Sequence, residues 1–200
     1  MSQPQAQAMS RTEAKAQRRS VLLNSAATLF AQRGFRGVSI EDLGAAAGVS
    51  GPAVYRHFNG KQALLGALLV GVSEDLLSGG QAVVNSTPDV EAALRALVAF
   101  HVDFALSKPD VIRVQDRDFE NLGSDERAAV RSLQRAYVEL WVGALGQLFP
   151  ERDAAVRRLQ AHAIFGLINS TPHSVQMHRE PAATARPVLE AMAWAGLTGL

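Results

Sequence analysis

The sequence predicts an all-α fold, with a small three-helix head at the N-terminus and a longer helical body behind it. Apolar residues recur at intervals of three and four along most segments, as they do in amphipathic helices. No segment shows the alternating, β-branched pattern of a strand. Gly or Pro marks most breaks between the periodic segments. A chain of 200 residues can bury a substantial core in one or two domains.

The composition excludes several classes of protein. The chain has no Cys, so disulfides, thiolate metal sites and Cys nucleophiles are ruled out. No apolar run reaches 18 residues, so we expect no membrane span. The first ten residues are polar and lack the charged and apolar regions of a secretory signal. We therefore expect a disordered tail over residues 1–10 and a cytoplasmic protein.

The helices of the head and body follow from the periodicity and its breaks. Residues 11–33 form a first helix, whose apolar stripe includes Val21, Leu22 and Phe30 and which Gly34 ends. A helix that starts at Lys61 is expected to end near Ser78, before the pair Gly79-Gly80. Five more helices are expected: 89–107, one opened by Pro109, 124–149 (capped by Ser124), 151–170 and 182–197.

Between the first two long helices lies a stretch that reads as two short helices joined by a tight turn. Ser39 and Asp42 form a capping box at the start of the first short helix. Gly48 suits the left-handed residue that ends it. Ser50 caps the second short helix, and Pro52 fits its first turn, where a missing N–H does little harm.

The second short helix has distinct inner and outer faces. Val54 and Phe58, four residues apart, are expected to point inward, which leaves Tyr55, Arg56 and His57 on the outside. Two helices at a steep angle, a turn that contains Gly, and an outward hydroxyl, guanidinium and imidazole predict a helix-turn-helix.

The charge is unevenly divided along the chain, although the net charge is only +1. Residues 1–61 hold eight Lys or Arg against three Asp or Glu, whereas residues 62–200 hold twelve against sixteen. The basic end coincides with the helix-turn-helix. Such a division is expected of a phosphate-binding head on a neutral to acidic body.

The segment from Ala26 to Leu65, AATLFAQRGFRGVSIEDLGAAAGVSGPAVYRHFNGKQALL, resembles the TetR family of bacterial transcriptional regulators. The ordered set of short motifs over forty residues carries the resemblance, and Gly44 departs from it because the family commonly has Ala there. The resemblance implies a helix-turn-helix DNA-binding domain over residues 11–60 and a helical ligand-binding and dimerisation domain over residues 61–200. It further implies a homodimer, a palindromic double-stranded DNA operator and a small-molecule effector.

The resemblance places Tyr55, His57 and Lys61 at DNA phosphates. Their side chains suit this role, and the helix N-termini at the two capping serines also favour phosphate. Base reading falls to the start of the second short helix, which offers few hydrogen-bonding groups, so DNA shape is expected to contribute to readout. The predicted DNA-binding residues are Ser39, Ser50, Gly51, Pro52, Ala53, Tyr55, Arg56, His57 and Lys61.

A ligand pocket is expected between the middle helices of the body. Polar residues on otherwise apolar faces are the best candidates, because a buried polar group needs a partner. The segment DVIRVQDRDFENL resembles members that respond to acyl-CoA thioesters, so an acyl-CoA or another hydrophobic metabolite is a candidate effector. The predicted pocket residues, each of which also fits plain core, are Phe100, His101, Phe104, Val114, Gln115, Phe119, Tyr137, Trp141, Phe165 and Asn169.

Dimerisation is implied through the last two large helices, 151–170 and 182–197. The second of these carries small residues that suit close packing, namely Ala183, Ala191, Ala193, Ala195 and Gly196. The expected mechanism is release from DNA when ligand favours one setting of the helix that starts at Lys61. The sign of regulation, repression relieved by ligand, is adopted from the commonest mode of the family.

Two other functions fit part of the sequence: a small α-helical enzyme and a lipid carrier with a hydrophobic cavity. No nucleophile-elbow motif and no Gly-rich phosphate loop is present, so we expect no enzyme activity and no cofactor. His173 and His178 are five residues apart and form at most a weak metal motif, so no metal site is predicted. A lipid carrier would explain the body but not the basic head.

Overall fold

The computed structural model describes residues 11–174 and 182–199, and within these ranges it contains helices and no strand, which confirms the all-α prediction. The tail predicted over residues 1–10 lies outside the described residues. The elements are α1 (Arg11–Arg33), α2 (Ile40–Ala46), α3 (Gly51–Val54), α4 (Lys61–Ser86), α5 (Val90–Ser107), α6 (Pro109–Asp118), the 3₁₀ turn η1 (Phe119–Asn121), α7 (Ser124–Leu148), α8 (Ala154–Asn169), α9 (Thr171–Ser174) and α10 (Ala182–Thr198).

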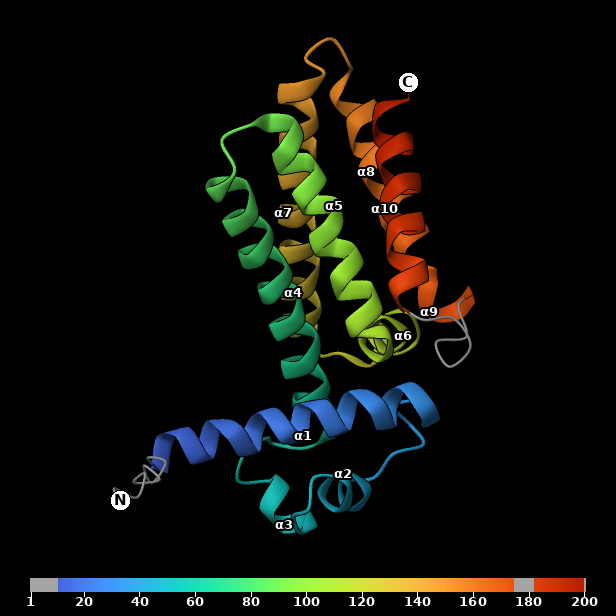
Figure 1. Cartoon of the computed structure of the whole chain (residues 1–200). Coiled ribbons are helices and arrows are strands. Elements are labelled where there is room, and N and C mark those ends of the chain that lie inside the picture. Colours follow the sequence, from blue (N-terminus) through green and yellow to red (C-terminus); the bar gives the residue numbers. More distant parts are fainter. Residues whose placement is uncertain (1–10, 175–181, 200) are drawn as a thin grey trace, which may run out of the picture.

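The head and body occupy opposite ends of an elongated molecule (Figure 1). Helix α1 crosses beneath the body, and α2 and α3 lie below it at the far end. Helices α4, α5, α7, α8 and α10 run alongside one another in the body, where α4 packs on α5 and α7, and α8 packs on α7 and α10. The short α6 lies near the junction and contacts α1.

Helix α1 buries one stripe against the rest of the head. Leu22, Ala26 and Phe30, spaced by four, are almost fully buried, as expected for one face of a helix. Val21 was predicted on this stripe but is 41% exposed, because it lies one position before Leu22 and so off the row of residues spaced by four. Gly34 follows the helix with a φ of 76°, so it ends α1 as predicted.

The predicted turn between α2 and α3 is present. The backbone N–H of Asp42 donates to the Ser39 hydroxyl at 3.0 Å, and the Ser39 N–H donates to the Asp42 carboxylate at 2.9 Å, which completes the capping box. Gly48 has a φ of 68° and ends α2. Val54 and Phe58 are buried, as predicted for the inner face.

Ser50 occupies the N-cap position of α3, but its side chain makes no capping hydrogen bond, contrary to the prediction. The cause is local. Pro52 has no N–H to offer, and the N–H of Ala53 instead donates to the Ser50 backbone carbonyl at 2.9 Å. Helix α3 is also short, since it ends at Val54 and continues only as a turn to His57.

The end predicted for the helix from Lys61 was wrong, because α4 continues through Gly79 and Gly80 to Ser86. These glycines allow close packing. A Cβ on Gly79 would overlap the Phe100 ring, and a Cβ on Gly80 would lie 2.7 Å from the Tyr137 ring. The pair therefore lets α5 and α7 approach α4. Ser124 was predicted to cap α7, but it is the first helical residue, and Gly123 occupies the cap position.

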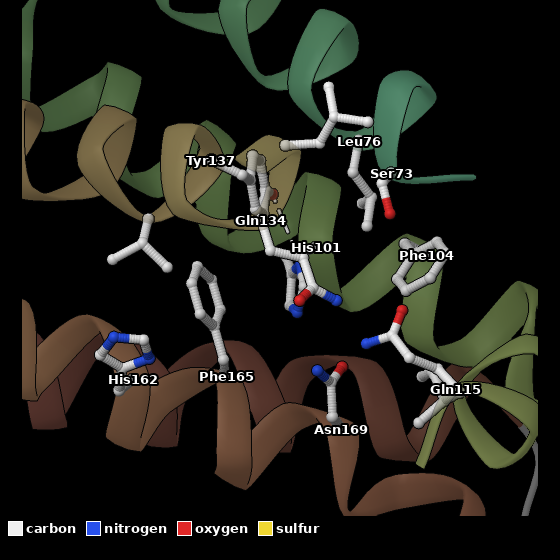
Figure 2. Close-up of a pocket in the computed structure, with 13 residues that line it drawn as sticks. Ser73, Leu76, His101, Phe104, Gln115, Gln134, Tyr137, His162, Phe165 and Asn169 are labelled. Atoms are coloured by element: carbon white, nitrogen blue, oxygen red, sulfur yellow. Dashed lines mark hydrogen bonds between the residues drawn. The ribbon is translucent and has the colours of Figure 1, made fainter. Parts of the chain in front are cut away.

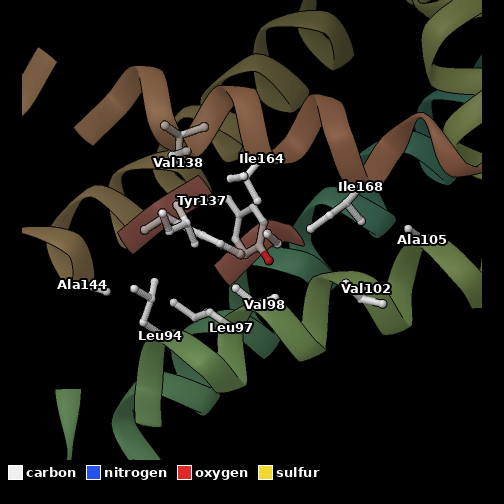
Figure 3. Packing of buried hydrophobic residues seen from close by; sticks show 14 of the residues in the cluster. Leu94, Leu97, Val98, Val102, Ala105, Tyr137, Val138, Ala144, Ile164 and Ile168 are labelled. Atoms are coloured by element: carbon white, nitrogen blue, oxygen red, sulfur yellow. The ribbon is translucent and has the colours of Figure 1, made fainter. Parts of the chain in front are cut away.

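The buried side chains form two clusters, and α4 contributes to both. The first joins α1–α3 to the N-terminal half of α4 and to parts of α6 and α7, and it includes Leu64, Leu65 and Leu69. The second fills the body between α5, α7, α8 and α10, and Leu76 and Leu77 pack against it. Figure 3 shows side chains of α5 in this second cluster facing those of α7 and α8.

Helix α4 is the only helix in the described ranges that is long and apolar enough to cross a membrane, and core helices pass the same test. It packs against α1, α5 and α7, as a core helix does.

Candidate nucleic-acid interface and ligand cavity

The outer face of the helix-turn-helix exposes two of the three side chains predicted there, Tyr55 and Arg56. Tyr55 is 58% exposed, and Arg56 is exposed with no ion pair among the described residues. Pro52 is exposed at the start of α3, and Ala53 beside it is half-buried. The face therefore offers a phenol and a guanidinium next to a nearly apolar helix start.

The two capping serines differ in what they leave available. The Ser39 hydroxyl donates to the Asp42 carboxylate at 2.6 Å and also accepts the Asp42 N–H. Its hydrogen bonds hold the pKa of Asp42 below its ordinary value. The hydroxyl of Ser50 is exposed and makes no capping bond, so it is the freer of the two to meet a phosphate.

Lys61 lies at the start of α4 and braces the turn between α1 and α2. Its ammonium donates to the carbonyls of Phe35 and Val38, each at 2.7 Å, and lies 4.4 Å from the centre of the Phe35 ring. Two of its three N–H groups are thus engaged within the protein. The third is what remains for a phosphate.

His57 is half-buried, and its Nδ1 is buried without a hydrogen-bond partner among the described residues. A phosphate contact from His57 would therefore have to come from the other ring nitrogen.

Gly44 and Gly51 set the close approach of α2 and α3. A Cβ on Gly44 would lie 2.8 Å from the Val49 carbonyl oxygen, which even Ala would not fit without a shift. The tight crossing of α2 and α3 therefore favours Gly44 over the Ala that the family commonly has there. A Cβ on Gly51 would meet Glu41 at 3.4 Å, so this position too favours a small residue.

The body contains a cavity of about 230 Å³ between α4, α5, α6, α7 and α8 (Figure 2). Its lining contains no Asp, Glu, Lys or Arg. The lining residues are Ser73, Leu76, His101, Phe104, Ile112, Gln115, Leu133, Gln134, Tyr137, Val138, His162, Phe165 and Asn169.

Aromatic rings form one wall of the cavity. The rings of Tyr137 and Phe165 are stacked, with centroids 5.5 Å apart and an angle of 14° between their planes. The His101 ring lies 4.8 Å from Phe165 and 5.8 Å from Phe104. Such contacts favour a flat or compact apolar ligand.

His101 and Tyr137 form a buried polar pair within this wall. The Tyr137 hydroxyl lies 3.4 Å from His101 Nδ1. Burial lowers the pKa of His101 from 6.5 to about 4, with the Asn169 side chain acting in the opposite direction, so the imidazole is neutral at pH 7. Burial also raises the pKa of Tyr137, so its phenol stays protonated.

A groove rich in arginine adjoins the cavity and shares Gln134, Val138 and His162 with it. We call this surface the basic groove; its charged residues are Arg131, Arg135, Glu139 and Arg158. Arg158 pairs with Glu139 at 2.7 Å, whereas Arg135 has no ion pair among the described residues. The basic groove is thus a cationic surface beside an uncharged cavity.

Helix α6 joins the cavity to the head. Ile112 and Gln115 line the cavity from α6. From the same helix, Arg117 donates to the carbonyls of Phe30 and Ala31 near the end of α1, the second at 3.2 Å.

A second contact strengthens this junction, since Thr28 of α1 donates to Asp110 of α6 at 3.1 Å. Helix α6 therefore contacts both the cavity and α1.

The described residues contain no group of three His, Asp or Glu that could hold a metal ion. His173 lies 3.1 Å from Asp116, and His178 lies outside the described residues.

Comparison with known proteins agrees with this arrangement. The model for bacterial regulatory proteins of the tetR family matches residues 22–68, and a model for a tetracyclin repressor-like C-terminal domain matches residues 87–173. The chain belongs to the TetR family of bacterial regulatory proteins. Members of this family are transcriptional regulators that bind DNA and small-molecule effectors, so neither the enzyme nor the lipid-carrier alternative is favoured.

Among similar proteins, the HTH-type transcriptional repressor KstR2 of Rhodococcus jostii is 33% identical over 135 residues, which cover 67% of this chain and 66% of KstR2. A TetR-family regulator from Bordetella parapertussis aligns with a TM-score of 0.79 at 23% identity, covering 91% of this chain and 96% of its own. AibR, solved with isovaleryl coenzyme A and operator DNA, aligns with a TM-score of 0.73 at 18% identity, covering 88% and 97%. The last two likenesses concern the fold alone.

The structure of this TetR-family chain brings six of the ten predicted pocket residues to the cavity. Those that line it are His101, Phe104, Gln115, Tyr137, Phe165 and Asn169. Four do not line it: Val114 and Trp141 are fully buried in the two hydrophobic clusters, Phe100 packs on Gly79, and Phe119 borders a separate surface groove.

Seven lining residues were not predicted: Ser73, Leu76, Ile112, Leu133, Gln134, Val138 and His162. Helical spacing could have found several of them, including His162 and Gln134. His162 lies three residues before Phe165 and seven before Asn169, and Gln134 lies three before Tyr137, so each shares a face with a predicted residue.

Proposed function

We propose that this protein is a ligand-released transcriptional repressor that binds a palindromic operator as a homodimer in the cytoplasm. One observation carries the proposal: a TetR-type helix-turn-helix and an uncharged cavity are joined by two helices, α4 and α6, that contact both. A helix that lines the cavity and touches the head can carry a change from one to the other.

On DNA, Tyr55, His57 and Lys61 contact phosphates, with the exposed hydroxyl of Ser50 and the N-terminus of α3 beside them. The N-terminus of α2 at Ser39 faces the backbone in the same way. The start of α3 enters the major groove, where Pro52 and Ala53 touch thymine methyl groups and Arg56 reaches a guanine.

The dimer forms through α8 and α10. The exposed large apolar side chains on these helices support this, since Val156 and Leu159 on α8 and Val188 and Met192 on α10 are 40–69% exposed. Packed against the same helices of a second copy, they complete a four-helix bundle. Two heads then read the two halves of a palindrome.

The small residues of α10 divide between two roles. Ala191, Ala195 and Gly196 are exposed and suit the dimer interface, whereas Ala193 is fully buried within its own subunit. Ala183, also predicted on this face, lies outside the residues whose side chains are described.

The effector is an acyl thioester of coenzyme A. The cavity lies below the range of about 300–1,000 Å³ typical of drug-sized ligands, so it can enclose the acyl end but not the nucleotide. The basic groove beside it offers Arg131, Arg135 and Arg158 to the phosphates. AibR, a similar fold, was solved with isovaleryl coenzyme A.

The protein leaves the operator when the bound ligand shifts α4 and α6 and so alters the spacing of the two α3 helices in the dimer. A coupling free energy of roughly 1–3 kcal/mol would change operator occupancy about 5- to 150-fold. The ligand would act on these helices at residues that line the cavity, such as Ser73 of α4 and Gln115 of α6.

Fluorescence anisotropy tests the proposal with DNA from the promoter of this protein's own gene. Binding should weaken steeply as salt rises, because each phosphate contact releases a counterion. Acyl-CoA should release the DNA, whereas coenzyme A alone should not. Binding without salt dependence, or without competitor resistance, would exclude the regulator.

The phosphate contacts are tested by Tyr55→Phe, which removes one hydroxyl and leaves the ring. We expect a loss of about 3- to 10-fold in affinity for operator and unrelated DNA alike, since phosphate contacts carry no sequence information. Glu74→Gln, on an exposed part of α4, is the control. A loss limited to particular bases would contradict the assignment of Tyr55 to a phosphate.

A further inference from the structure

Two buried polar atoms lie without partners at the wall of the cavity. His101 Nε2 and Asn169 Oδ1 are both buried, and neither has a hydrogen-bond partner among the described residues. Both residues line the cavity, and Figure 2 shows the Asn169 side chain rising from α8 toward the His101 ring. Buried polar groups in folded proteins are normally paired, so this pair marks a place where a ligand atom is expected.

The contact with the neighbouring tyrosine is linked to which His101 nitrogen carries the proton. The buried Tyr137 hydroxyl lies 3.4 Å from His101 Nδ1, and either group donates, depending on the tautomer of the imidazole. A hydroxyl that donates to Nδ1 leaves the imidazole proton on Nε2. In that tautomer Nε2–H is a donor and Asn169 Oδ1 is an acceptor; the two side chains are close enough for Asn169 to raise the pKa of His101, but no hydrogen bond joins these two atoms.

The remainder of the lining restricts the charge of the ligand. The lining has no Asp, Glu, Lys or Arg; its buried His101 is neutral at pH 7, and its second histidine, His162, lies at the exposed rim. An ion enclosed there would lose its water without gaining a counter-charge. The stacked rings of Tyr137 and Phe165 favour an apolar body for the ligand.

We propose that the cavity binds a compact, uncharged, apolar group that carries one hydroxyl, which accepts from His101 Nε2–H and donates to Asn169 Oδ1. A hydroxyl is the neutral group that meets both needs with one atom. The proposal rests on the proposed role of the cavity as the effector site and names the chemistry of the enclosed end.

Calorimetric titration of the full chain with three probes tests it: cyclohexanol, cyclohexanone and methylcyclohexane. Cyclohexanol should bind about tenfold more tightly than methylcyclohexane, although methylcyclohexane is the more apolar. Cyclohexanone, which accepts but cannot donate, should fall between them. Equal or tighter binding of methylcyclohexane, or no binding of cyclohexanol up to its solubility limit, would overturn the proposal.

Variants test whether His101 and Asn169 are the source of the preference for cyclohexanol over methylcyclohexane. His101→Phe and Asn169→Leu should each abolish the advantage of cyclohexanol, whereas Glu74→Gln, on an exposed part of α4 outside the cavity, should keep it. Asn169→Leu keeps the test open if His101→Phe does not fold. A preference that survives both substitutions would refute the assignment.

A spectroscopic measurement addresses the proton directly. The ¹⁵N shifts of His101 should report a proton on Nε2 in the free protein, and the Nε2 signal should move when cyclohexanol binds. A proton on Nδ1 would contradict the proposal. Loss of the hydroxyl preference leaves operator binding intact, whereas failure to bind operator leaves the preference intact, so the two proposals fail separately.

Discussion

At the scale of single residues, burial decides what His101 contributes. The ring is 3% exposed and surrounded by Phe104, Tyr137 and Phe165, so its charged form is poorly solvated. The consequence is a neutral group at pH 7 that can recognise a ligand by hydrogen bonding rather than by charge.

Acid should therefore weaken the fold through His101. The pKa of His101 is about 4 when folded and 6.5 when exposed, so the unfolded chain takes up the proton first as the pH falls. The stability that depends on a neutral His101 is fully present above pH 6.5 and is lost as the pH falls toward 4. From pH 7 to pH 5 we expect a loss of about 2 kcal/mol in the free energy of unfolding.

Urea unfolding of the wild type and of His101→Phe at both pH values isolates this effect, because other groups titrate in both proteins. The wild type should lose about 2 kcal/mol more than the variant. An identical loss in the two proteins would show that His101 is not the group responsible.

The sequence identified polar residues on apolar faces but not the direction each one takes. His101, Gln115 and Asn169 were chosen by that criterion, and all three line the cavity. Val114 and Trp141 were also predicted to line the cavity, but both side chains are fully buried in packed core. Which face meets a cavity depends on how neighbouring helices pack, and periodicity carries no information on that.

At the scale of helices, α4 shows that glycine can lie inside a helix as well as end one. Gly79 and Gly80 look like a helix end in sequence, yet they lie inside α4, where Phe100 and Tyr137 occupy the space of a side chain. Glycine costs roughly 1 kcal/mol relative to Ala inside a helix, and close packing offsets it here.

Two alanine substitutions in α4 should have opposite effects. Gly80→Ala places a Cβ 2.7 Å from the buried Tyr137 ring and should destabilise the protein by about 1–3 kcal/mol. Gly71→Ala meets nothing within 4 Å and should stabilise it by about 0.5–1 kcal/mol. Thermal unfolding of both variants measures the contrast, and stabilisation by Gly80→Ala would disprove the packing role.

Helix α6 holds the end of α1 through a polar side chain as well as through apolar contact. Arg117 donates to carbonyls of the last turns of α1, where a cation is favoured by the unpaired carbonyl groups. It also pairs with the buried carboxylate of Asp118 at 3.1 Å. The half-exposed Arg117 guanidinium is thus one of the contacts that hold this junction.

Arg117→Ala should loosen this junction. We expect a loss of about 1–2 kcal/mol in stability and faster hydrogen exchange of the Gly34 amide, which donates to Phe30. Lys108→Ala, which removes only a long 4.0 Å contact with Asp75, is the control. Unchanged exchange at Gly34 in the Arg117 variant would contradict this account.

At the scale of the whole molecule, the exposed apolar face of α8 and α10 makes dimerisation testable. Leu159→Arg puts a charge at the side chain that is 69% exposed on α8 and should give a monomer with at least about 100-fold weaker operator binding. Val21→Arg, at an apolar residue 41% exposed on α1, should leave the mass of the dimer unchanged. Sedimentation and anisotropy measure both, and a dimeric Leu159→Arg protein would refute this interface.

Most of the architecture was accessible from the sequence, because caps, glycines and apolar spacing mark helices locally. The capping box at Ser39 and the turn at Gly48 are examples. The basic groove was not anticipated, because Arg131 and Arg158 come from different helices and are joined only by the packing of α7 on α8. The division into domains at residue 60 remains a prediction.

The position of α4 in both hydrophobic clusters has a consequence for how the molecule melts. The leucines at 64, 65 and 69 complete the core of the head, while those at 76 and 77 pack on the core of the body. A fragment ending at residue 60 would lack part of its interior and should stay unfolded when expressed alone. In the intact chain, calorimetry should accordingly record one cooperative transition, in which the head and the cavity are lost at the same temperature.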